Sequence, residues 1–175
     1  MEINIRLAEK TEYEAVRDFY YNLIDDMQQS PYHPKWQKGV YPEDEYLEKS
    51  VISSQMYIAL SENQIIGAMI LNSKVTDGYG KVSWGIETQP DEIAVIHALG
   101  VSPSFQHRSV AQKMVLKAIK ISRESGKKAM RLDVLCDNIP ALRLYKKLGF
   151  EFRERIKLFY EDTGECDFDI FEYIL

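Results

Sequence analysis

The feature that most constrains the fold is a strand pattern that runs directly into the start of a helix near the middle of the chain. The apolar run Ile93 to Val101 is typical of a buried strand, and Ser109 to Ser125 carries its apolar residues on one helical face. The segment that joins them, Leu99 to Ala111, reads Leu-Gly-Val-Ser-Pro-Ser-Phe-Gln-His-Arg-Ser-Val-Ala. A buried strand that feeds a helix predicts an α/β domain.

The rest of the chain continues this mixture of strands and helices. Further strands are expected at Ile3 to Leu7, Met56 to Leu60, Ile65 to Leu71, Ala129 to Cys136, Phe150 to Tyr160 and Phe168 to Leu175. Further helices are expected at Thr11 to Met27, Glu43 to Ser53 and Pro140 to Leu148. This order predicts a single α/β domain over residues 1–175, with a mixed central sheet of about six to seven strands flanked by about four helices.

Composition limits the partners. The 22 Lys and Arg against 27 Asp and Glu give a net charge of −5, which argues against a nucleic-acid partner because phosphate neutralisation needs clustered cations. We see neither an apolar signal core at the start nor a stretch apolar enough to span a membrane, so we expect a cytoplasmic protein with no membrane partner. Cys136 and Cys166 form no Cys-x-x-Cys pair, so no metal site is expected.

A second block of residues follows the junction and completes a family pattern. It reads Asn138-Ile139-Pro140-Ala141 and then Leu144-Tyr145-Lys146-Lys147-Leu148-Gly149-Phe150. From Ile93 to Phe150 the chain resembles the GNAT superfamily of acyl-CoA N-acyltransferases. The resemblance implies a GNAT-type fold with a twisted sheet. It also implies that acetyl-CoA binds with its pyrophosphate on the loop residues Gln106, His107, Arg108, Ser109, Val110 and Ala111.

This loop departs from the family pattern at one position. Gln106 and Ala111 match the pattern, whereas Ser109 stands where glycine is usual. The unpaired N–H groups and the dipole of a helix N-terminus attract an anion, and glycine lets phosphate oxygens approach the backbone closely. Two alternatives stay open. Ser109 with Gln112 has the spacing of a capping box, and Arg108 either pairs with a phosphate of the cofactor or is solvated.

The central strand is expected to hold the arm of acetyl-CoA. Period-two alternation predicts one face with Ile93, Val95, His97, Leu99 and Val101, and another with Ala94, Ile96, Ala98 and Gly100. The resemblance implies that this strand parts from the strand Ala129 to Cys136, and that the arm pairs with the backbone of Leu99, Gly100 and Val101. It also implies that Asn138 reaches the arm; alternatively, Asn138 caps the helix that follows it.

Acyl transfer from a thioester to an amine needs one group that removes a proton and one that supplies a proton. The resemblance implies that Tyr145 is the acid, since a phenol with a pKa of about 10 carries a proton at neutral pH. Alternatively, Tyr145 packs beside its apolar neighbours. His97 is a candidate base because imidazole titrates near neutral pH, and Glu92 acting through a water is another. Alternatively, His97 is a core histidine and Glu92 is solvated.

The acceptor is expected to be an amine. In the family, the N-terminal helices and the loop before the central strand shape the acceptor site. Here these segments carry aromatic and acidic residues that suit a cation, namely Tyr20, Tyr21, Asp25, Asp26, Tyr32, Trp36, Tyr41, Tyr79 and Trp84. The prediction is an N-acetyltransferase that moves an acetyl group from acetyl-CoA to a small-molecule or peptide amine by direct attack. A non-catalytic acyl-CoA-binding or regulatory module is the alternative, and pairing of the closing strands into a homodimer stays open.

Overall fold

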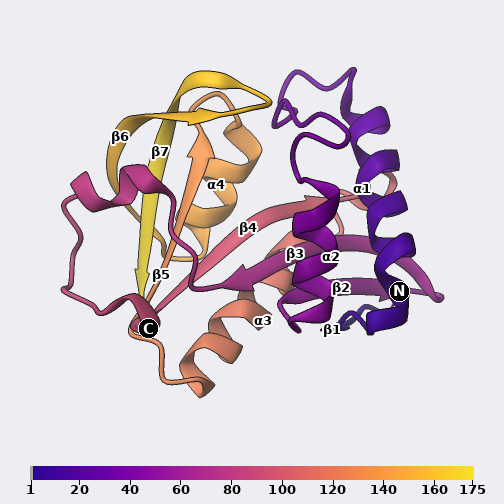
Figure 1. Cartoon of the computed structure of the whole chain (residues 1–175), viewed down its shortest axis with the longest axis horizontal. Coiled ribbons are helices and arrows are strands. Elements are labelled where there is room, and N and C mark those ends of the chain that lie inside the picture. Colours follow the sequence, from indigo (N-terminus) through magenta and orange to yellow (C-terminus); the bar gives the residue numbers. More distant parts are fainter. Residues whose placement is uncertain (1) are drawn as a thin grey trace.

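A mixed sheet organises the computed structural model, which describes residues 2–175 (Figure 1). Its seven strands lie in the order β1-β2-β3-β4-β5-β7-β6, and only the pair β4–β5 is parallel. The strands are β1 (Asn4–Leu7), β2 (Met56–Ser61), β3 (Gln64–Asn72), β4 (Ile93–Val101), β5 (Ala129–Leu135), β6 (Glu151–Tyr160) and β7 (Gly164–Ile174). The predicted mixed α/β fold is confirmed.

Two helices cover each face of the sheet. Helices α1 (Tyr13–Met27) and α2 (Asp44–Ile52) lie over one face, where α1 buries Leu23 against the sheet. Helices α3 (Val110–Glu124) and α4 (Ile139–Lys147) lie over the other face, where α3 buries Met114. Each helix presents an apolar stripe to the sheet, which is why the helical periodicity predicted them well. Within residues 2–175, none of the helices combines the length and apolar content that a membrane crossing needs.

Short 3-10 turns occupy the connections. They are η1 (Lys10–Glu12), η2 (Asp77–Lys81), η3 (Pro90–Glu92) and η4 (Pro103–Phe105). The turn η1 takes up the start of the helix predicted from Thr11, so α1 begins at Tyr13. Strand β7 begins at Gly164 rather than at Phe168, because its polar first residues pair with β6 as far as Tyr160. Polar residues on an exposed ribbon lack the apolar alternation that marks a buried strand.

Strands β4 and β5 run side by side only at their beginnings. Their pairing covers Ile93 to Val95 of β4, whereas β4 stays paired with β3 as far as Val101. Beyond Val95 the two strands separate, as Figure 1 shows. The separation leaves one backbone edge of β4 without a strand partner among residues 2–175.

A bulge in β4 changes which residues share a face. Ala98 has a φ of 48°, and the register with β3 shifts between Ala68 and Ile70. One extra residue in a bulged strand reverses the alternation beyond it. Leu99 and Val101 therefore pack with Ala94 and Ile96 on the α3 face. The predicted face, which grouped Leu99 and Val101 with Val95 and His97, is wrong because it assumed an unbroken strand.

Candidate active site

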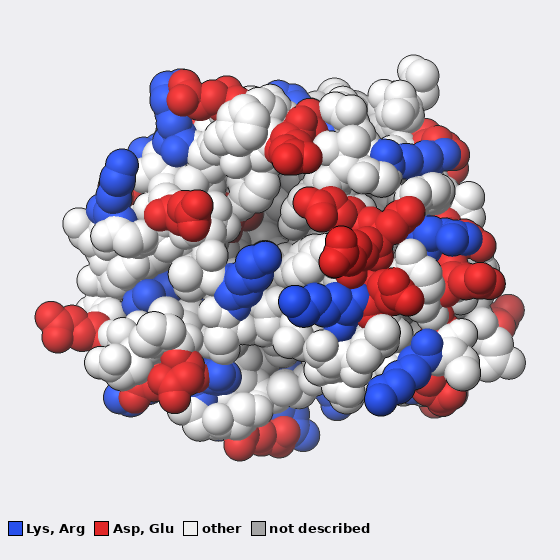
Figure 2. Space-filling view, viewed as in Figure 1, with Lys and Arg blue, Asp and Glu red and all other residues white. Residues whose placement is uncertain are grey.

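A cavity of about 790 Å³ occupies the space that opens between β4 and β5. On its helix side, the lining includes Leu99, Val101, Gln106, Ser109, Ala111, Asn138 and Tyr145. On its loop side, the lining includes Trp36, Tyr41, Asp133, Tyr160 and Asp162. Figure 2 shows a recess near the middle of the face that carries α2, over the region where the two strands part. A ligand in this cavity contacts both faces of the sheet.

The predicted phosphate loop forms the start of α3. Ser109 has a φ of 60°, in the left-handed region, and its side chain makes no capping hydrogen bond. The capping-box alternative is therefore not formed. Ser109 instead adopts the backbone conformation that glycine adopts easily, so the serine keeps the loop shape at a cost in strain. The first N–H groups of α3 receive no cap from the Ser109 side chain, and Ser109, Val110 and Ala111 at this helix start line the cavity.

Most of the predicted cofactor residues line the cavity. Gly100, His107 and Val110 do so together with the helix-side residues already named. Arg108 does not line the cavity, and its guanidinium lies 5.4 Å from the ring centroid of Phe105. Asn138 lines the cavity and also caps α4, because its side-chain oxygen accepts from Ala141 N at 3.4 Å. The capping alternative for Asn138 is thus observed.

Tyr145 projects from α4 into the helix side of the cavity wall. Its ring packs edge-on against Phe150, with ring centroids 5.3 Å apart, and only 6% of the residue is exposed. Burial raises the pKa of the phenol above its ordinary value of 10, so Tyr145 stays protonated at neutral pH. Within residues 2–175 its hydroxyl has no hydrogen-bond partner. The ring of Tyr145 is therefore part of the core, and its protonated hydroxyl group lies at the cavity.

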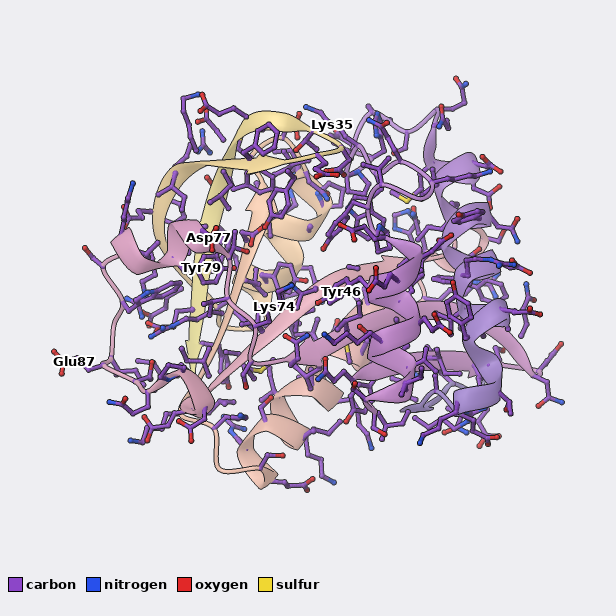
Figure 3. All side chains as sticks on the ribbon, viewed as in Figure 1. Lys35, Tyr46, Lys74, Asp77, Tyr79 and Glu87 are labelled. Carbon is purple, nitrogen blue, oxygen red and sulfur yellow. The ribbon has the colours of Figure 1, made fainter. Side chains whose placement is uncertain are left out.

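His97 lies in a more enclosed environment on the α2 side of β4. Its Nε2 is 3.0 Å from Oδ1 of Asn72, and its ring meets that of Tyr46 edge-on at a centroid distance of 6.2 Å. Figure 3 shows Tyr46 beside Lys74, whose Nζ is 5.3 Å from the Tyr46 ring centroid. Burial lowers the pKa of His97 from 6.5 to about 4. His97 lines the cavity but holds a proton weakly at neutral pH.

Glu92 lies outside this cavity, at the beginning of β4. It pairs with Lys128, with Oε1 2.6 Å from Nζ, and it accepts from Gln89 N at 2.9 Å. The hydrogen bond from Lys128 lowers the pKa of this carboxyl. Because the beginning of β4 is the paired end of the strand, the structure places Glu92 away from the site for which the sequence analysis considered it.

Asp133 on β5 is a cavity residue that the sequence analysis missed. Its Oδ2 accepts from the hydroxyl of Tyr79 at 2.8 Å, and both of its oxygens lie 3.2 Å from the hydroxyl of Tyr160. Burial raises the pKa of this carboxyl above its ordinary value of 3.8, and the two phenol hydrogen bonds oppose that rise. Tyr79 reaches it from η2, in front of β5 (Figure 3). Asp133 is thus a carboxylate held by two donors at the cavity wall.

A signal for Asp133 was present in the sequence. In the predicted strand, Met130, Leu132 and Val134 fill the α3–α4 face of the core, whereas Arg131 and Asp133 alternate with them. Charged residues at every second position of a buried strand all lie on the same face of the sheet. Because a buried charge needs a polar partner, that face is expected to contain polar groups or a site. Arg131 forms an ion pair with Glu172, and Asp133 lines the cavity.

The predicted aromatic and acidic wall divides into three groups. Tyr32, Trp36 and Tyr41 line the cavity, and Tyr79 bonds to Asp133. Tyr20 is fully buried and donates to the carbonyl oxygen of Ala98 at 2.8 Å, so it is part of the core. The remaining residues do not line the cavity, namely Tyr21, Asp25, Asp26 and Trp84.

The family model described as "Acetyltransferase (GNAT) family" matches residues 20–150. The chain belongs to the GNAT acetyltransferase family. An uncharacterised N-acetyltransferase of Methanocaldococcus jannaschii is 33% identical over 75 residues, which are 43% of this chain and 33% of that protein. The N-alpha-acetyltransferase RimI of Mycobacterium tuberculosis is 29% identical over 107 residues, which are 61% of this chain and 64% of RimI. The matches therefore span less than two thirds of either relative.

Solved structures share the fold. The crystal structure of PaiA N-acetyltransferase from Thermoplasma acidophilum, in complex with coenzyme A, has a TM-score of 0.69 at 21% identity, with 100% of both chains covered. At this identity the likeness concerns the architecture. It agrees with the sheet and helix arrangement of this GNAT protein and confirms the predicted fold, whereas the family model confirms the predicted family.

Proposed function

We propose that this protein transfers the acetyl group of acetyl-CoA to a primary amine. The observation that carries the proposal is the cavity between β4 and β5, which joins an uncapped helix N-terminus on one side to the partly buried carboxylate of Asp133 on the other. An acyl donor and an acceptor that enter from opposite faces of the sheet meet between these strands.

The helix side suits acetyl-CoA. The N–H groups at the start of α3 offer donors to the pyrophosphate, and the helix dipole favours its negative charge. The unpaired edge of β4 beyond Val95 offers backbone groups at Leu99 and Val101 to the amides of the pantetheine arm. The solved PaiA structure, which holds coenzyme A in the same fold, supports this assignment.

Two side chains then handle the protons. Asp133 accepts a proton from the bound ammonium, directly or through a water, and the neutral nitrogen attacks the thioester carbonyl. When the C–S bond breaks, Tyr145 donates its proton to the departing thiolate. The nitrogen gives up its second proton as the amide forms, and this proton restores the phenol of Tyr145. The proton on Asp133 passes to solvent, so that one acetyl group moves and one proton is released per turnover.

Asp133 is preferred to the two bases considered from the sequence. Its raised pKa lies closer to neutral pH than an ordinary aspartate, which suits a general base. His97 has a pKa of about 4 and is packed against Tyr46 and Asn72. Glu92 is bound to Lys128 outside the cavity. Neither His97 nor Glu92 is carried into the proposed mechanism.

The acceptor belongs to the amine class. The name of the relative RimI, an N-alpha-acetyltransferase, keeps a peptide α-amine among the candidates, and the acidic group at the loop side suits any ammonium.

Two measurements test the proposal. Calorimetric titration with acetyl-CoA, desulfo-CoA and free ADP asks whether binding needs the sulfur or the pantetheine arm, or already occurs with the pyrophosphate end. Release of free CoA thiol, with and without an amine, then asks whether transfer occurs. We expect micromolar binding that is retained with desulfo-CoA, together with amine-dependent CoA release. Binding without amine-dependent release across a broad amine panel would instead favour the non-catalytic acyl-CoA-binding module, and the absence of binding would remove both functions.

A further inference from the structure

Three aromatic rings cross the loop side of the cavity in one row. Trp36 and Tyr41 belong to the connection between α1 and α2, and Tyr160 ends β6. The ring centroids of Trp36 and Tyr41 are 5.9 Å apart, and those of Tyr41 and Tyr160 are also 5.9 Å apart. All three residues line the cavity and are partly exposed to it. They therefore differ from Tyr20, whose ring is fully buried.

The row of rings extends from β4 to β5, the two strands that separate. At one end, Cζ3 of Trp36 lies 3.4 Å from the position that a Cβ on Gly100 of β4 would occupy. At the other end, the hydroxyl of Tyr160 lies 3.2 Å from the carboxylate of Asp133 on β5. An acceptor that approaches the thioester from the loop side must therefore pass over these rings to reach Asp133.

We infer that the acceptor is a small amine with a single positive charge on an apolar body, held as its ammonium ion by Trp36, Tyr41, Tyr160 and Asp133. The inference rests on the proposed acetyl transfer and names the substrate class of that site. The faces of aromatic rings attract a cation, most strongly when both are shielded from water, and they also cover the hydrocarbon next to it. Asp133 completes the site as the counter-charge.

The two carboxylates beside the row favour a cation over an anion. Two carboxylates, Asp133 and Asp162, line the loop side of the cavity, and Arg143 of α4 is the one Arg or Lys among its described lining residues. Lys35, the nearest lysine in sequence to Trp36, pairs with Asp137, with Nζ 3.6 Å from Oδ2. A carboxylate on the acceptor would lie close to Asp133 and Asp162, and the repulsion between like charges would weaken its binding.

A contact between two loops lies beside the loop side of the cavity and disfavours a long acceptor. The side-chain amide of Gln37 donates to the carbonyl oxygen of Asp162 at 2.7 Å, which ties the α1–α2 connection to the turn between β6 and β7. Figure 1 shows that turn beside the connection. Gln37 directly follows Trp36 in the sequence, and Asp162 lies two residues after Tyr160. A polypeptide acceptor would have to pass this contact, whereas a small molecule would not.

The test compares acceptors by their kcat/KM for CoA release. The panel contains 2-phenylethylamine and hexylamine, which are apolar and carry one charge, then phenylalanine, spermidine and a tetrapeptide that begins with alanine. 2-Phenylethylamine and phenylalanine form a matched pair that differs only by a carboxylate. We expect the two apolar amines to exceed the other three by about tenfold or more. A preference for spermidine or the peptide would overturn this inference and leave the proposed acetyl transfer intact. No release from any amine would overturn both.

A variant series tests the rings themselves. Trp36→Leu keeps an apolar side chain but removes the π face, so we expect its KM for 2-phenylethylamine to rise about three- to thirtyfold while kcat changes little. Trp36→Phe restores a ring and should recover most of the KM. Phe159→Leu is the matched control, because Phe159 neighbours Tyr160 but is 71% exposed and outside the cavity. An unchanged KM in folded Trp36→Leu would contradict the ammonium site.

Discussion

The two sides of the cavity are built in different ways. The helix side comes mostly from one continuous stretch, Leu99 to Ala111, and much of what it offers is main chain. The loop side comes from segments far apart in the sequence, and it offers the side chains of Trp36, Asp133 and Tyr160. A site made of backbone groups tolerates a change of side chain, as Ser109 shows, whereas a site made of side chains changes with each of them. This difference is consistent with a family motif on the helix side and with the acceptor site that we propose on the loop side.

The largest effect is expected from Asp133→Asn. The amide keeps the shape and the contacts to Tyr79 and Tyr160 but cannot accept the ammonium proton. We expect kcat to fall about a thousandfold while the Kd of acetyl-CoA stays the same, which would separate the two sides of the cavity. Steady-state kinetics and calorimetry measure both quantities. The control is Asp167→Asn, on the exposed ribbon of β7. A variant that kept full kcat would remove Asp133 from the chemistry.

The pH dependence of kcat/KM probes the same carboxyl. Because burial raises the pKa of Asp133 above 3.8, its base form is lost at a higher pH than for an ordinary aspartate. As the pH falls below this raised pKa, Asp133 gains a proton and the rate should drop about tenfold per pH unit. An acid limb that persisted in the residual activity of Asp133→Asn would point to another base.

A smaller effect is expected from Tyr145→Phe on the helix side. The ring packing against Phe150 is kept, and only the proton donor is lost. We expect kcat to fall about a hundredfold with little change in cofactor affinity. Tyr57→Phe on β2 is the control, since Tyr57 does not line the cavity. Unchanged turnover would leave Tyr145 with a packing role alone.

A modest gain is expected from Ser109→Gly. The left-handed φ of Ser109 strains a residue with a Cβ by about 1–2 kcal/mol, and glycine removes that strain at the expense of some unfolded-state entropy. We expect acetyl-CoA to bind up to about fivefold more tightly, because the loop is then easier to hold in its binding shape. Ser109→Ala, which keeps the strain, is the control. Weaker binding in the glycine variant would show that the serine hydroxyl donates to the cofactor.

The smallest effect is expected from Glu92→Gln. This change removes the pair with Lys128 at the paired end of β4, far from the separation of the strands. We expect kcat/KM to stay within about twofold of the parent value, as for most surface substitutions. A loss of kcat/KM comparable with that of Asp133→Asn would show that Glu92 takes part in the reaction although it lies outside the cavity.

Much of the fold could be predicted from the sequence, and errors occurred where chain segments meet. Apolar periodicity gave the strands and helices because each buries a face of its own. The alternation in β4 was misread beyond Ala98, since a bulge leaves no mark in the residue pattern and is fixed by pairing with β3. Glu92 and Asp133 are both carboxylates in or beside buried strands, and the sequence favoured the one that the structure leaves outside the cavity.

The sequence by itself determined the family, the strand–loop–helix junction and the aromatic, acidic character of the acceptor segments, because these depend on residues close together in the chain. Tertiary structure alone decided that β4 and β5 separate after Val95, that Asp133 faces the cavity, and that Trp36, Tyr41 and Tyr160 form one row. The physical reason is that strand pairing and loop contacts form between distant segments, and the order of strands in the sheet decides which distant side chains become neighbours.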